Sequence, residues 1–589
     1  MPRVKADIGR QRAGAASILL CLGFALIFAR SLQLMVVDRD RILPLRRLVD
    51  ARGTGPCVRP GDIFDCRGEP IATSVALSWV CAAPPVIEEA DRRKTARVLA
   101  AQLGQDQSHI LAQLSRPLSH VVLLKDVGPQ DARAVAGLSL PGIMVERGYA
   151  RLYPLAEVCG PLVGFREKSI SLTGLSGLEA TLDPILIGGS DSRCAAIWPL
   201  APVGLTSGSP RGTREPHNVV LTLDARIQAA AFRILSEHMQ MWRAKAASCT
   251  IMDPATGEIL CMVSLPAFDP NSFEKVPVSE WHEFQCIPAS LAFEPGSMCK
   301  PLILAAALES GAVAPQQRFV CTGTRRLGGW TIGCWGQYRR TGHGTVTPIT
   351  GLVRSCNMAY AQISTAVGPS QLHGWLQEFG LGRSTGSECY AEASGHLPPI
   401  SSIGAVKLAT MGYGQSLTVT GLQVVAAFGA IANDGALVRP HIVSAITTAD
   451  GEVLERVEPQ VVRQAISPRT AHMVLDAMED VVAGSAGTGR AARIAGCRVC
   501  GKTGTAQKVG QGEEGGGYLE KRYISSFVGV AGVATKRPIV ILVWFDEPAG
   551  GATGGRVAAP AFKQVAEAAL RHLGVLPAAR PTQGRRAAA

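Results

Sequence analysis

The hydrophobic positions of this chain begin with one uncharged run close to its start. Residues 13–29 carry no charged side chain, and apolar residues continue after Arg30 as far as residue 37. At about 1.5 Å per residue, a helix over 13–37 is long enough to cross the hydrocarbon core of a bilayer. No small-x-small cleavage site follows the run, so we expect an uncleaved membrane anchor rather than a signal peptide. Residues 1–12 would then be a cytoplasmic tail.

The rest of the chain is expected to lie on the outer side of the cytoplasmic (inner) membrane, which the chain would cross once. Basic residues flank the apolar run on both sides, so charge alone does not orient it. A long following domain can be translocated regardless of such charges. No second stretch is apolar and long enough to span a bilayer.

The second part of the chain alternates between strand-like and helix-like patterns. Residues 249–252 and 259–265 are apolar runs separated by a polar turn, as in a β-hairpin. Similar paired runs occur at 526–533 and 539–545, and apolar residues at helical spacing lie between the two pairs. Strands at both ends with helices in the middle predict one α/β domain over 216–575, with an antiparallel sheet flanked by helices.

The region before this domain has a different sequence pattern. Residues 38–215 contain short strand-like and helix-like segments broken by Gly and Pro, and a turn-rich stretch at 204–217 marks the boundary. We therefore expect a separate N-terminal α+β domain over 38–215, which agrees with the length of 589 residues, too long for one core. Residues 576–589 are small and basic, and we expect a disordered tail there.

Composition narrows the class of protein. Hydrophobic residues make up 47% of the chain and charged residues 18%, which is globular rather than disordered. The net charge of +12 brings a nucleic-acid-binding module into consideration. However, the sequence has no zinc-finger spacing, no aromatic RNA-binding motif and no long Lys/Arg run, so we expect no nucleic-acid partner. A basic surface that faces anionic lipid or an anionic wall polymer fits the charge equally well.

The first candidate for chemistry is the S-x-x-K motif of Ser297 and Lys300. Pro301 is tolerated only in the first turn of a helix, so the helix should begin near Ser297 and carry both side chains on one face. A lysine that is desolvated near another cation has a lowered pKa and can take the proton of a serine nucleophile. The motif alone is weak, because Ser272 and Lys275 form a second copy in a polar loop.

The second candidate is Ser355-Cys-Asn357. The serine could relay a proton between the lysine and a leaving amine, and the asparagine amide could hold a substrate backbone and orient the lysine. Taken alone, the same residues would be interpreted as a helix cap or an Asx turn.

The third candidate is the K-T-G segment that begins at Lys502. Its lysine offers a cation for a substrate carboxylate, Thr503 and Thr505 offer hydroxyls, and Gly504 lets an extended substrate approach the backbone. Alone, it would be a glycine-broken turn with a solvated lysine. The three motifs together are strong evidence for a catalytic site, because S-x-x-K, S-x-N and K-T-G follow one another in the order and at the separations that this catalytic set requires.

With these motifs the chain resembles the penicillin-binding proteins, specifically the monofunctional class B transpeptidases. Further segments carry the resemblance: 61–65, 174–179, 221–228, 253–260, 342–345, 412–415 and 546–548. The resemblance implies a penicillin-binding/serine β-lactamase-like transpeptidase domain at 216–575 and a non-catalytic pedestal or dimerisation domain at 38–215. No metal and no cofactor are expected.

The resemblance also implies a mechanism. Ser297 would attack the penultimate D-alanine carbonyl of a peptidoglycan stem pentapeptide, with Lys300 as the base and Ser355 as a proton shuttle. The backbone N–H groups of Ser297 and Thr505 would form the oxyanion hole. β-Lactam antibiotics would acylate the same serine.

Substrate binding would fall to the remaining motif residues. Asn357 would hold the stem peptide, and Lys502 and Thr505 would anchor the terminal carboxylate, with Thr503 and Gly504 beside them. The asparagine and the Phe-Glu-Pro-Gly-Ser context resemble the division-specific enzyme. Its partners would be a lipid-linked glycan polymerase and other division proteins of the membrane.

Several alternatives remain open at this point. The chain could be an elongation-type transpeptidase, a D,D-carboxypeptidase or β-lactamase-like hydrolase on the same fold, or a wall-assembly scaffold without activity. The intact motif residues argue against the scaffold, and the membrane anchor and pedestal argue against a simple hydrolase.

Sixteen cysteines add two further questions. Pairs such as Cys321 with Cys334 could form disulfides, whereas the lone C-x-x-C at 497–500 has no partner pair and does not predict a zinc site. Small, semi-apolar packing is the simple role for cysteines in or beside the motifs, and modulation by oxidation is the alternative. Three cysteines have this position: Cys299, Cys356 and Cys500.

Overall fold

The computed structural model describes four stretches of the chain: residues 58–167, 172–188, 215–509 and 517–577. The expected anchor at 13–37, the tail at 1–12 and nearly all of the tail at 576–589 lie outside these stretches. Within the described residues, no helix combines the length and the hydropathy needed to cross a membrane.

The described residues form two compact units. Unit 1 contains Val75–Ala150, and unit 2 contains Pro60–Ser74, Arg151–Glu167 and the described residues from Leu172 onward. The expected boundary near residue 215 followed a change in composition, whereas the units follow packing. Three short described stretches of the N-terminal region, 60–74, 151–167 and 172–188, therefore belong to the same unit as the motifs.

Unit 1 is a small sheet covered by helices. Buried residues of its strands, such as Val80 and Ala82, share a core with Leu99 and Ile110 from two of the helices. β2 pairs antiparallel with β3 and also with β4. The elements that contribute to this unit are β2 (Pro70–Ala82, from Val75 on), η2 (Pro84–Val86), α3 (Glu89–Leu103), α4 (Gln107–Leu114), β3 (Val121–Val127), α5 (Pro129–Gly137) and β4 (Ile143–Leu152).

A buried ion cluster organises the N-terminal segments of unit 2. The Glu179 carboxylate accepts hydrogen bonds from Arg151 Nε and Arg166 Nε, each at 2.6 Å, and Arg166 Nη2 also lies 2.5 Å from Asp183 Oδ1. Removing one member of such a cluster leaves an uncompensated buried charge, which costs about 3–5 kcal/mol. The short elements around it are β1 (Ile63–Phe64), η3 (Ala156–Val158), α6 (Gly160–Val163), α7 (Gly177–Thr181) and α8 (Asp183–Leu186).

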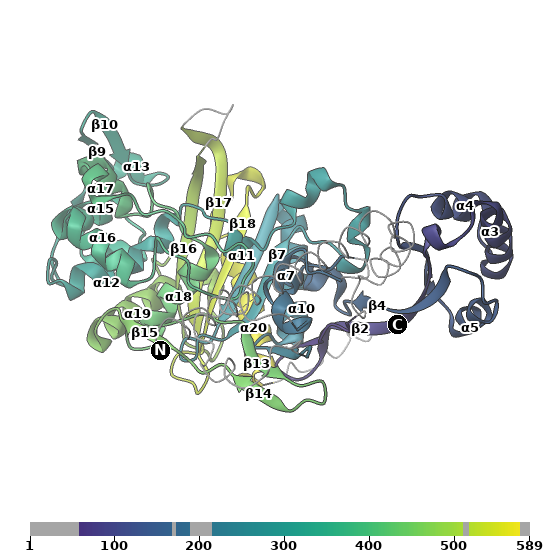
Figure 1. Cartoon of the computed structure of the whole chain (residues 1–589). Helices are drawn as coiled ribbons and strands as arrows, with labels where there is room; N and C mark the ends of the chain where they lie inside the picture. Colours follow the sequence, from purple (N-terminus) through teal and green to yellow (C-terminus); the bar gives the residue numbers. More distant parts are fainter. Residues whose placement is uncertain (1–57, 168–171, 189–214, 510–516, 578–589) are drawn as a thin grey trace, which may run out of the picture. The chain divides into compact units, whose positions relative to one another are not determined.

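The centre of unit 2 is a five-stranded antiparallel sheet in the order β16-β17-β18-β6-β7. It confirms the prediction that strands from the two ends of the domain pair, since Met252 of β6 lies opposite Val540 of β18. Figure 1 shows these strands side by side, teal beside yellow. Their bounds are β6 (Ala246–Met252), β7 (Ile259–Leu265), β16 (Val499–Val509), β17 (Tyr518–Ala531) and β18 (Ile539–Asp546).

Both faces of this sheet are covered, which explains its nearly continuous apolar strands. Along β18, Ile541 and Val543 belong to one hydrophobic cluster and Leu542 and Trp544 to the other, as the two-residue period of a strand requires. Helices α10 (Ala225–Trp242) and α20 (Ala558–His572) pack on the first face, and α18 (Gly421–Ala432) and α19 (Pro468–Ala483) on the second.

Beyond the second face lies a lobe of helices and short strands (Figure 1). Its central helix, α12, is buried along most of its length, because its sequence is apolar on all sides. The lobe contains η7 (Gly296–Cys299), α12 (Lys300–Glu309), β8 (Phe319–Cys321), β9 (Thr324–Leu327), β10 (Trp330–Gly333), α13 (Tyr338–Thr341), β11 (Gly344–Val346), α14 (Pro348–Val353), α15 (Asn357–Val367), α16 (Pro369–Glu378), η8 (Ile400–Ser402) and α17 (Ala405–Met411).

The remaining elements of unit 2 are short. β5 lies beside β13 and β1, and β12 pairs with β15. Their bounds are β5 (Asn218–Leu221), η5 (Pro270–Lys275), η6 (Val278–Glu283), α11 (Ile287–Ser290), β12 (Ala436–Val438), β13 (Val443–Thr447), β14 (Val453–Arg456), β15 (Val461–Gln464), η9 (Arg490–Ala492) and η11 (Ala549–Gly551).

Candidate active site

Ser297 lies on a tight turn between the sheet and the helical lobe. The turn η7 leads directly into α12, with Pro301 in its first turn as the sequence predicts. Gly296 has a φ of +54°, and a Cβ atom there would lie 3.2 Å from Cβ of Ala506 on β16. The glycine therefore lets the turn adopt a left-handed conformation while it packs against the K-T-G strand.

Lys300 is fully buried beneath this turn, and its Nζ atom contacts both of the first two motifs. Nζ lies 3.0 Å from Ser297 Oγ, 2.8 Å from the Ser355 carbonyl oxygen and 2.7 Å from Asn357 Oδ1. Burial lowers the pKa of Lys300 to about 8, an effect that the neighbouring thiols Cys334 and Cys356 partly oppose. A neutral amine at this position can donate to the two carbonyl oxygens and still accept the proton of Ser297.

Ser355 lies between the two motif lysines. Its hydroxyl oxygen is 3.2 Å from Lys300 Nζ and 3.0 Å from Lys502 Nζ. The residue has a φ of +55°, in the left-handed region that non-glycine residues rarely adopt. Such conformations cost about 1–3 kcal/mol and concentrate at functional sites. The strained turn between α14 and α15 is thus what directs this hydroxyl to both amines.

Lys502 is also fully buried, and its amine is directed at Ser355 rather than at solvent. Nζ donates in addition to the carbonyl oxygen and the hydroxyl of Thr503, at 3.0 and 3.2 Å. Burial, followed by the charge of Lys300, lowers the pKa of Lys502 well below its ordinary value. The two amines share one hydroxyl in a site that disfavours two positive charges.

The K-T-G segment lies in edge strand β16, and packing explains why residue 504 is a glycine. A Cβ atom on Gly504 would lie 2.3 Å from Ser526 Oγ and 2.8 Å from Met298 Cγ. Only glycine therefore lets β16 fit between β17 and the turn that carries the nucleophile. Thr505 accepts a hydrogen bond from Gly554 N at 3.1 Å, and Thr503 shares one with Thr488 at 3.0 Å.

A cleft of ≈ 1660 Å³ opens above these residues. Ser297, Ser355, Asn357, Thr503 and Thr505 all line it, whereas the two lysines lie behind its wall. The cleft also has basic and aromatic lining residues that the motifs did not predict: Arg339, Arg354, Lys407, Arg490, Arg556, Trp330, Trp335, Tyr413, Tyr518 and Tyr523. They come from several separate helices, strands and turns, so no single motif spacing could have identified them as a group.

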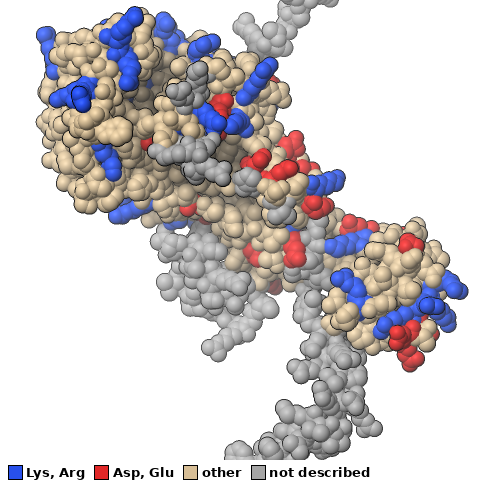
Figure 2. Space-filling view, turned by 90° about the horizontal axis from the view of Figure 1, so that it is seen from above, with Lys and Arg blue, Asp and Glu red and all other residues tan. Residues whose placement is uncertain are grey.

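The basic lining agrees with the charge of the surrounding surface. In Figure 2, blue side chains predominate over the helical part of unit 2, at the left of the view. A cleft with cationic groups raises the local concentration of anionic ligands. It is therefore suited to a ligand that carries carboxylates.

The structure describes the cysteines that were expected to form disulfides or to pack beside the motifs. Cys321 and Cys334 are free thiols rather than a disulfide, and both face the imidazole of His343. Cys299 and Cys500 are buried free thiols, and burial raises the pKa of each to about 12.

Comparison with known proteins agrees with this geometry. Residues 247–567 match the penicillin binding protein transpeptidase domain, and residues 58–194 match the penicillin-binding protein dimerisation domain. The chain is 32% identical to stage V sporulation protein D of Bacillus subtilis over 526 residues, which cover 88% of this chain and 79% of that protein. It is 29% identical over 571 residues to the peptidoglycan D,D-transpeptidase FtsI of Escherichia coli (strain K12), covering 96% and 92%.

A solved structure supports the same relationship. The crystal structure of penicillin binding protein 3 from Mycobacterium tuberculosis, complexed with aztreonam, matches with a TM-score of 0.67 and 26% identity, covering 88% of this chain and 97% of that one. The chain therefore belongs to the penicillin-binding protein transpeptidase family. With its dimerisation domain it is a class B member, a serine-type peptidoglycan D,D-transpeptidase.

Proposed function

We propose that this chain cross-links peptidoglycan outside the cytoplasmic membrane, at the division septum, through an acyl-enzyme on Ser297. The observation that carries the proposal is a continuous line of four polar atoms: Ser297 Oγ, Lys300 Nζ, Ser355 Oγ and Lys502 Nζ. Successive atoms are 3.0, 3.2 and 3.0 Å apart. Such a line connects the nucleophile to a base and to a proton relay.

Acylation begins when neutral Lys300 accepts the proton of Ser297. The serine oxygen forms a bond to the carbonyl carbon of the penultimate D-alanine, and the backbone N–H groups of Ser297 and Thr505 stabilise the oxyanion. Loss of one such donor typically lowers the rate by about 10²–10³-fold. Ser355 then passes a proton to the leaving nitrogen and is reprotonated from Lys300, so terminal D-alanine departs as a neutral amine.

Deacylation reverses these transfers. The amine of a neighbouring stem peptide gives a proton to the relay and forms a bond to the acyl carbon. The bond to Ser297 Oγ then breaks, and the oxygen regains its proton through Lys300. The number of protons on the enzyme is unchanged after one cycle, so the cycle needs no further proton donor or acceptor.

The terminal carboxylate of the stem is assigned to the threonines of the K-T-G strand. Lys502 was expected to anchor this carboxylate together with Thr505, and its amine is buried and directed at Ser355. We assign the direct contacts to Thr503 and Thr505, which line the cleft, and Lys502 acts on the carboxylate through the Thr503 hydroxyl at 3.2 Å. Asn357 would hold the backbone of the stem.

The septal role and the membrane anchor rest on the sequence. Asn357 and the Phe-Glu-Pro-Gly-Ser context before the nucleophile favour a division-specific enzyme. The anchor at 13–37 would hold the enzyme beside a lipid-linked glycan polymerase and other division proteins. Depletion of the enzyme in the native cell should therefore produce filaments with unfinished septa. Rounded cells would instead indicate the elongation role.

The catalytic proposal is tested on membranes that contain the full chain. A fluorescent penicillin should label the protein, and digestion should locate the label on the peptide that contains Ser297. A long-lived adduct, together with cross-linked product from two stem peptides, is the expected result. Rapid release of hydrolysed drug would favour a β-lactamase-like hydrolase, and release of D-alanine without cross-links would favour a carboxypeptidase. Growth of cells with Ser297→Ala as the sole copy would favour the scaffold.

A further inference from the structure

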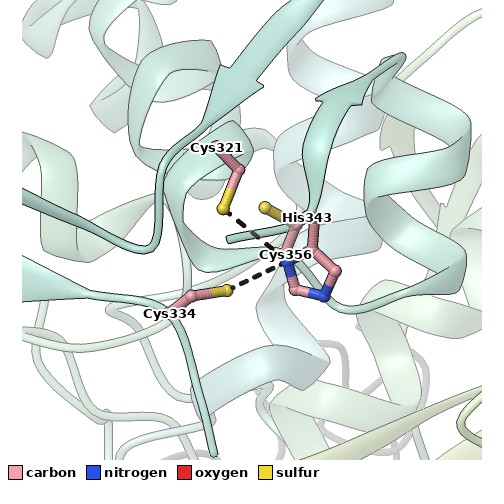
Figure 3. A group of neighbouring side chains, drawn as sticks. All are labelled: Cys321, Cys334, His343 and Cys356. Carbon is pink, nitrogen blue, oxygen red and sulfur yellow. Dashed lines mark hydrogen bonds between the residues drawn. The ribbon is translucent and has the colours of Figure 1, made fainter. Parts of the chain in front are cut away.

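Three thiols and one imidazole converge on a point next to the S-x-N motif. Cys321, Cys334, His343 and Cys356 each present one donor atom, and these four atoms all lie within 4.8 Å of one another. Figure 3 shows the three sulfur atoms directed toward the same side of the histidine ring. Only His343 is partly exposed, and the three cysteines are buried. The catalytic steps above use none of these four side chains.

The spacing of the donor atoms fits a tetrahedral metal ion. With Zn–S bonds of about 2.3 Å and Zn–N bonds of about 2.0–2.1 Å, a tetrahedral ion places its sulfur and nitrogen ligands about 3.5 Å apart. In this chain the Nδ1 atom of His343 lies 3.3 Å from Cys334 Sγ and 3.7 Å from Cys321 Sγ. A neutral histidine protonated at Nε2 presents its lone pair at Nδ1. The ring is held in place by stacking on Tyr338, with centroids 3.9 Å apart.

Cys356 lies at the N-terminus of a helix, where a backbone N–H group contacts its sulfur. This residue is the N-cap of α15, and its Sγ atom accepts a hydrogen bond from Ala359 N at 3.4 Å. Backbone N–H groups at a helix N-terminus stabilise an anion, and a thiolate is the form of cysteine that binds metal. Cys356 is thus placed to serve as a ligand without giving up its role in the turn.

Four segments of the lobe would be joined by an ion at this point. Cys321 ends β8, Cys334 follows β10, His343 precedes β11 and Cys356 begins α15. The side-chain amide of Asn357 already donates to the Gly333 carbonyl oxygen at 3.3 Å, so the S-x-N turn and the end of β10 are in contact. A metal ion would fix the two residues on either side of Cys356, which are Ser355 and Asn357.

We propose that Cys321, Cys334, His343 and Cys356 bind one zinc ion, which holds the S-x-N turn in its catalytic conformation. Four protein ligands leave no open position, so this ion is structural and does not activate water. Three thiolates and an imidazole select zinc over the oxygen-binding cations magnesium and calcium. A disulfide is the competing use of these thiols, but it would engage two cysteines and leave the third thiol and the imidazole without a role.

The zinc content of the purified full chain tests the proposal. Protein prepared without chelators should carry about one zinc ion per chain by elemental analysis. The Cys334→Ser variant should carry little, whereas Cys389→Ser, which removes a buried free thiol outside the cluster, should keep the full amount. Equal zinc in the Cys334→Ser variant would overturn the site. So would a wild-type protein that takes up no zinc when its thiols are reduced.

A spectroscopic measurement on the wild-type protein does not depend on the folding of any variant. Wild-type protein stripped with a chelator and loaded with Co²⁺ should show thiolate-to-cobalt charge-transfer absorption and the intense visible bands of a tetrahedral ion. Weak octahedral bands would contradict the ligand set. Peptide mapping of the untreated protein provides a third readout, because a linked Cys321–Cys334 or Cys334–Cys356 peptide would overturn the zinc site in favour of a redox pair.

The positioning role is separated from metal binding by kinetics. Chelation should lower the rate of penicillin acylation at Ser297 by at least tenfold and lower the Tm, and added zinc should restore both. The Cys389→Ser protein should respond in the same way, and the Cys334→Ser protein should be slow with or without zinc. If the zinc-free, folded protein were acylated at the full rate, the zinc site itself would still stand, but its role in positioning the S-x-N turn would be overturned. Acylation at another residue would overturn the proposed function without affecting the metal analysis.

Discussion

Nζ of Lys502 lies 3.0 Å from Oγ of Ser355, although the two residues are 147 positions apart in the sequence. Both side chains are buried, and the lysine is screened from the cleft by Thr503 and the serine. We therefore propose that Lys502 supports proton transfer through Ser355, in addition to its action on the substrate carboxylate through Thr503. A variant at this lysine should therefore affect the rate of chemistry more than the affinity for a substrate.

Replacement of Lys502 by methionine should lower the acylation rate constant by about 10²–10⁴-fold, the usual contribution of a general acid–base group. Methionine fills most of the same volume and removes a buried amine, so the Tm should not fall. The rate is followed with a chromogenic β-lactam under single-turnover conditions. Lys508→Met is the control, because Lys508 lies on the same strand but pairs with Asp546 and Glu547. A change confined to the apparent affinity would contradict the relay role.

The nucleophile itself gives the largest effect. Ser297→Ala should abolish the covalent penicillin adduct, with a loss on the order of 10⁶-fold, because removal of a catalytic nucleophile leaves only background chemistry. The matched control is Ser272→Ala, which disrupts the second S-x-x-K copy on η5, outside the cleft lining. Intact-protein mass spectrometry detects the adduct. Loss of labelling in Ser272→Ala instead would reassign the nucleophile.

The pH dependence of acylation should report Lys300. Its pKa is lowered to about 8 by burial, and the base is the neutral form. Below that pH the fraction of neutral amine falls tenfold per unit, so the acylation rate should rise with pH and level off above about 8. An arginine at this position stays protonated, so Lys300→Arg should be inactive throughout the range. A rate that keeps rising toward the ordinary pKa of lysine would contradict the assignment.

Backbone strain at Ser355 predicts a difference in stability between two variants that both lose activity. Ser355→Gly and Ser355→Ala both remove the hydroxyl that contacts the two lysines, so both should lose most acylation. Because φ is +55° at this residue, the glycine variant should be the more stable of the two by about 1 kcal/mol. Urea denaturation of both variants measures the difference. A glycine variant that is less stable than the alanine variant would mean that the turn carries no strain.

Packing around Gly504 predicts the effect of a single methyl group. Gly504→Ala should destabilise the protein by about 1–3 kcal/mol and lower acylation, because the new Cβ atom would overlap Ser526 and Met298 and push β16 away from the nucleophile turn. Gly374→Ala in α16 is the control, since nothing lies within 4 Å of the Cβ position there. That change should raise stability by about 0.5–1 kcal/mol through helix propensity. Thermal unfolding of both variants checks the contrast.

The sequence predicts the start of α12 and the paired strands of the sheet because both depend on local constraints. Pro301 can occupy only the first turn of a helix, so the start of α12 and the common face of Ser297 and Lys300 follow from three residues. The paired apolar runs predict β6, β7, β17 and β18, and the periodicity of a strand explains why they pair. The prediction that the three motifs converge rested on their order along the chain and on the resemblance to a family.

The cysteine–histidine cluster was not predictable in the same way. Its members are 13, 9 and 13 residues apart, whereas recognisable zinc motifs contain at least one pair separated by two to four residues. Only the lone C-x-x-C at 497–500 has such spacing, and it belongs to a different part of the fold. The expectation of no zinc site was argued from Cys497 and Cys500 and did not consider these four residues. The basic residues of the cleft were not predicted for a related reason, since they come from separate elements that no motif connects.

The pairing of β6 with β18 has a consequence for biogenesis. About 290 residues separate the paired positions Met252 and Val540, so one edge of the β6–β7 hairpin stays uncovered until nearly the whole domain has been synthesised. An uncovered edge of apolar strands invites pairing with other chains. Truncation before residue 539 should therefore yield aggregates rather than a smaller folded domain.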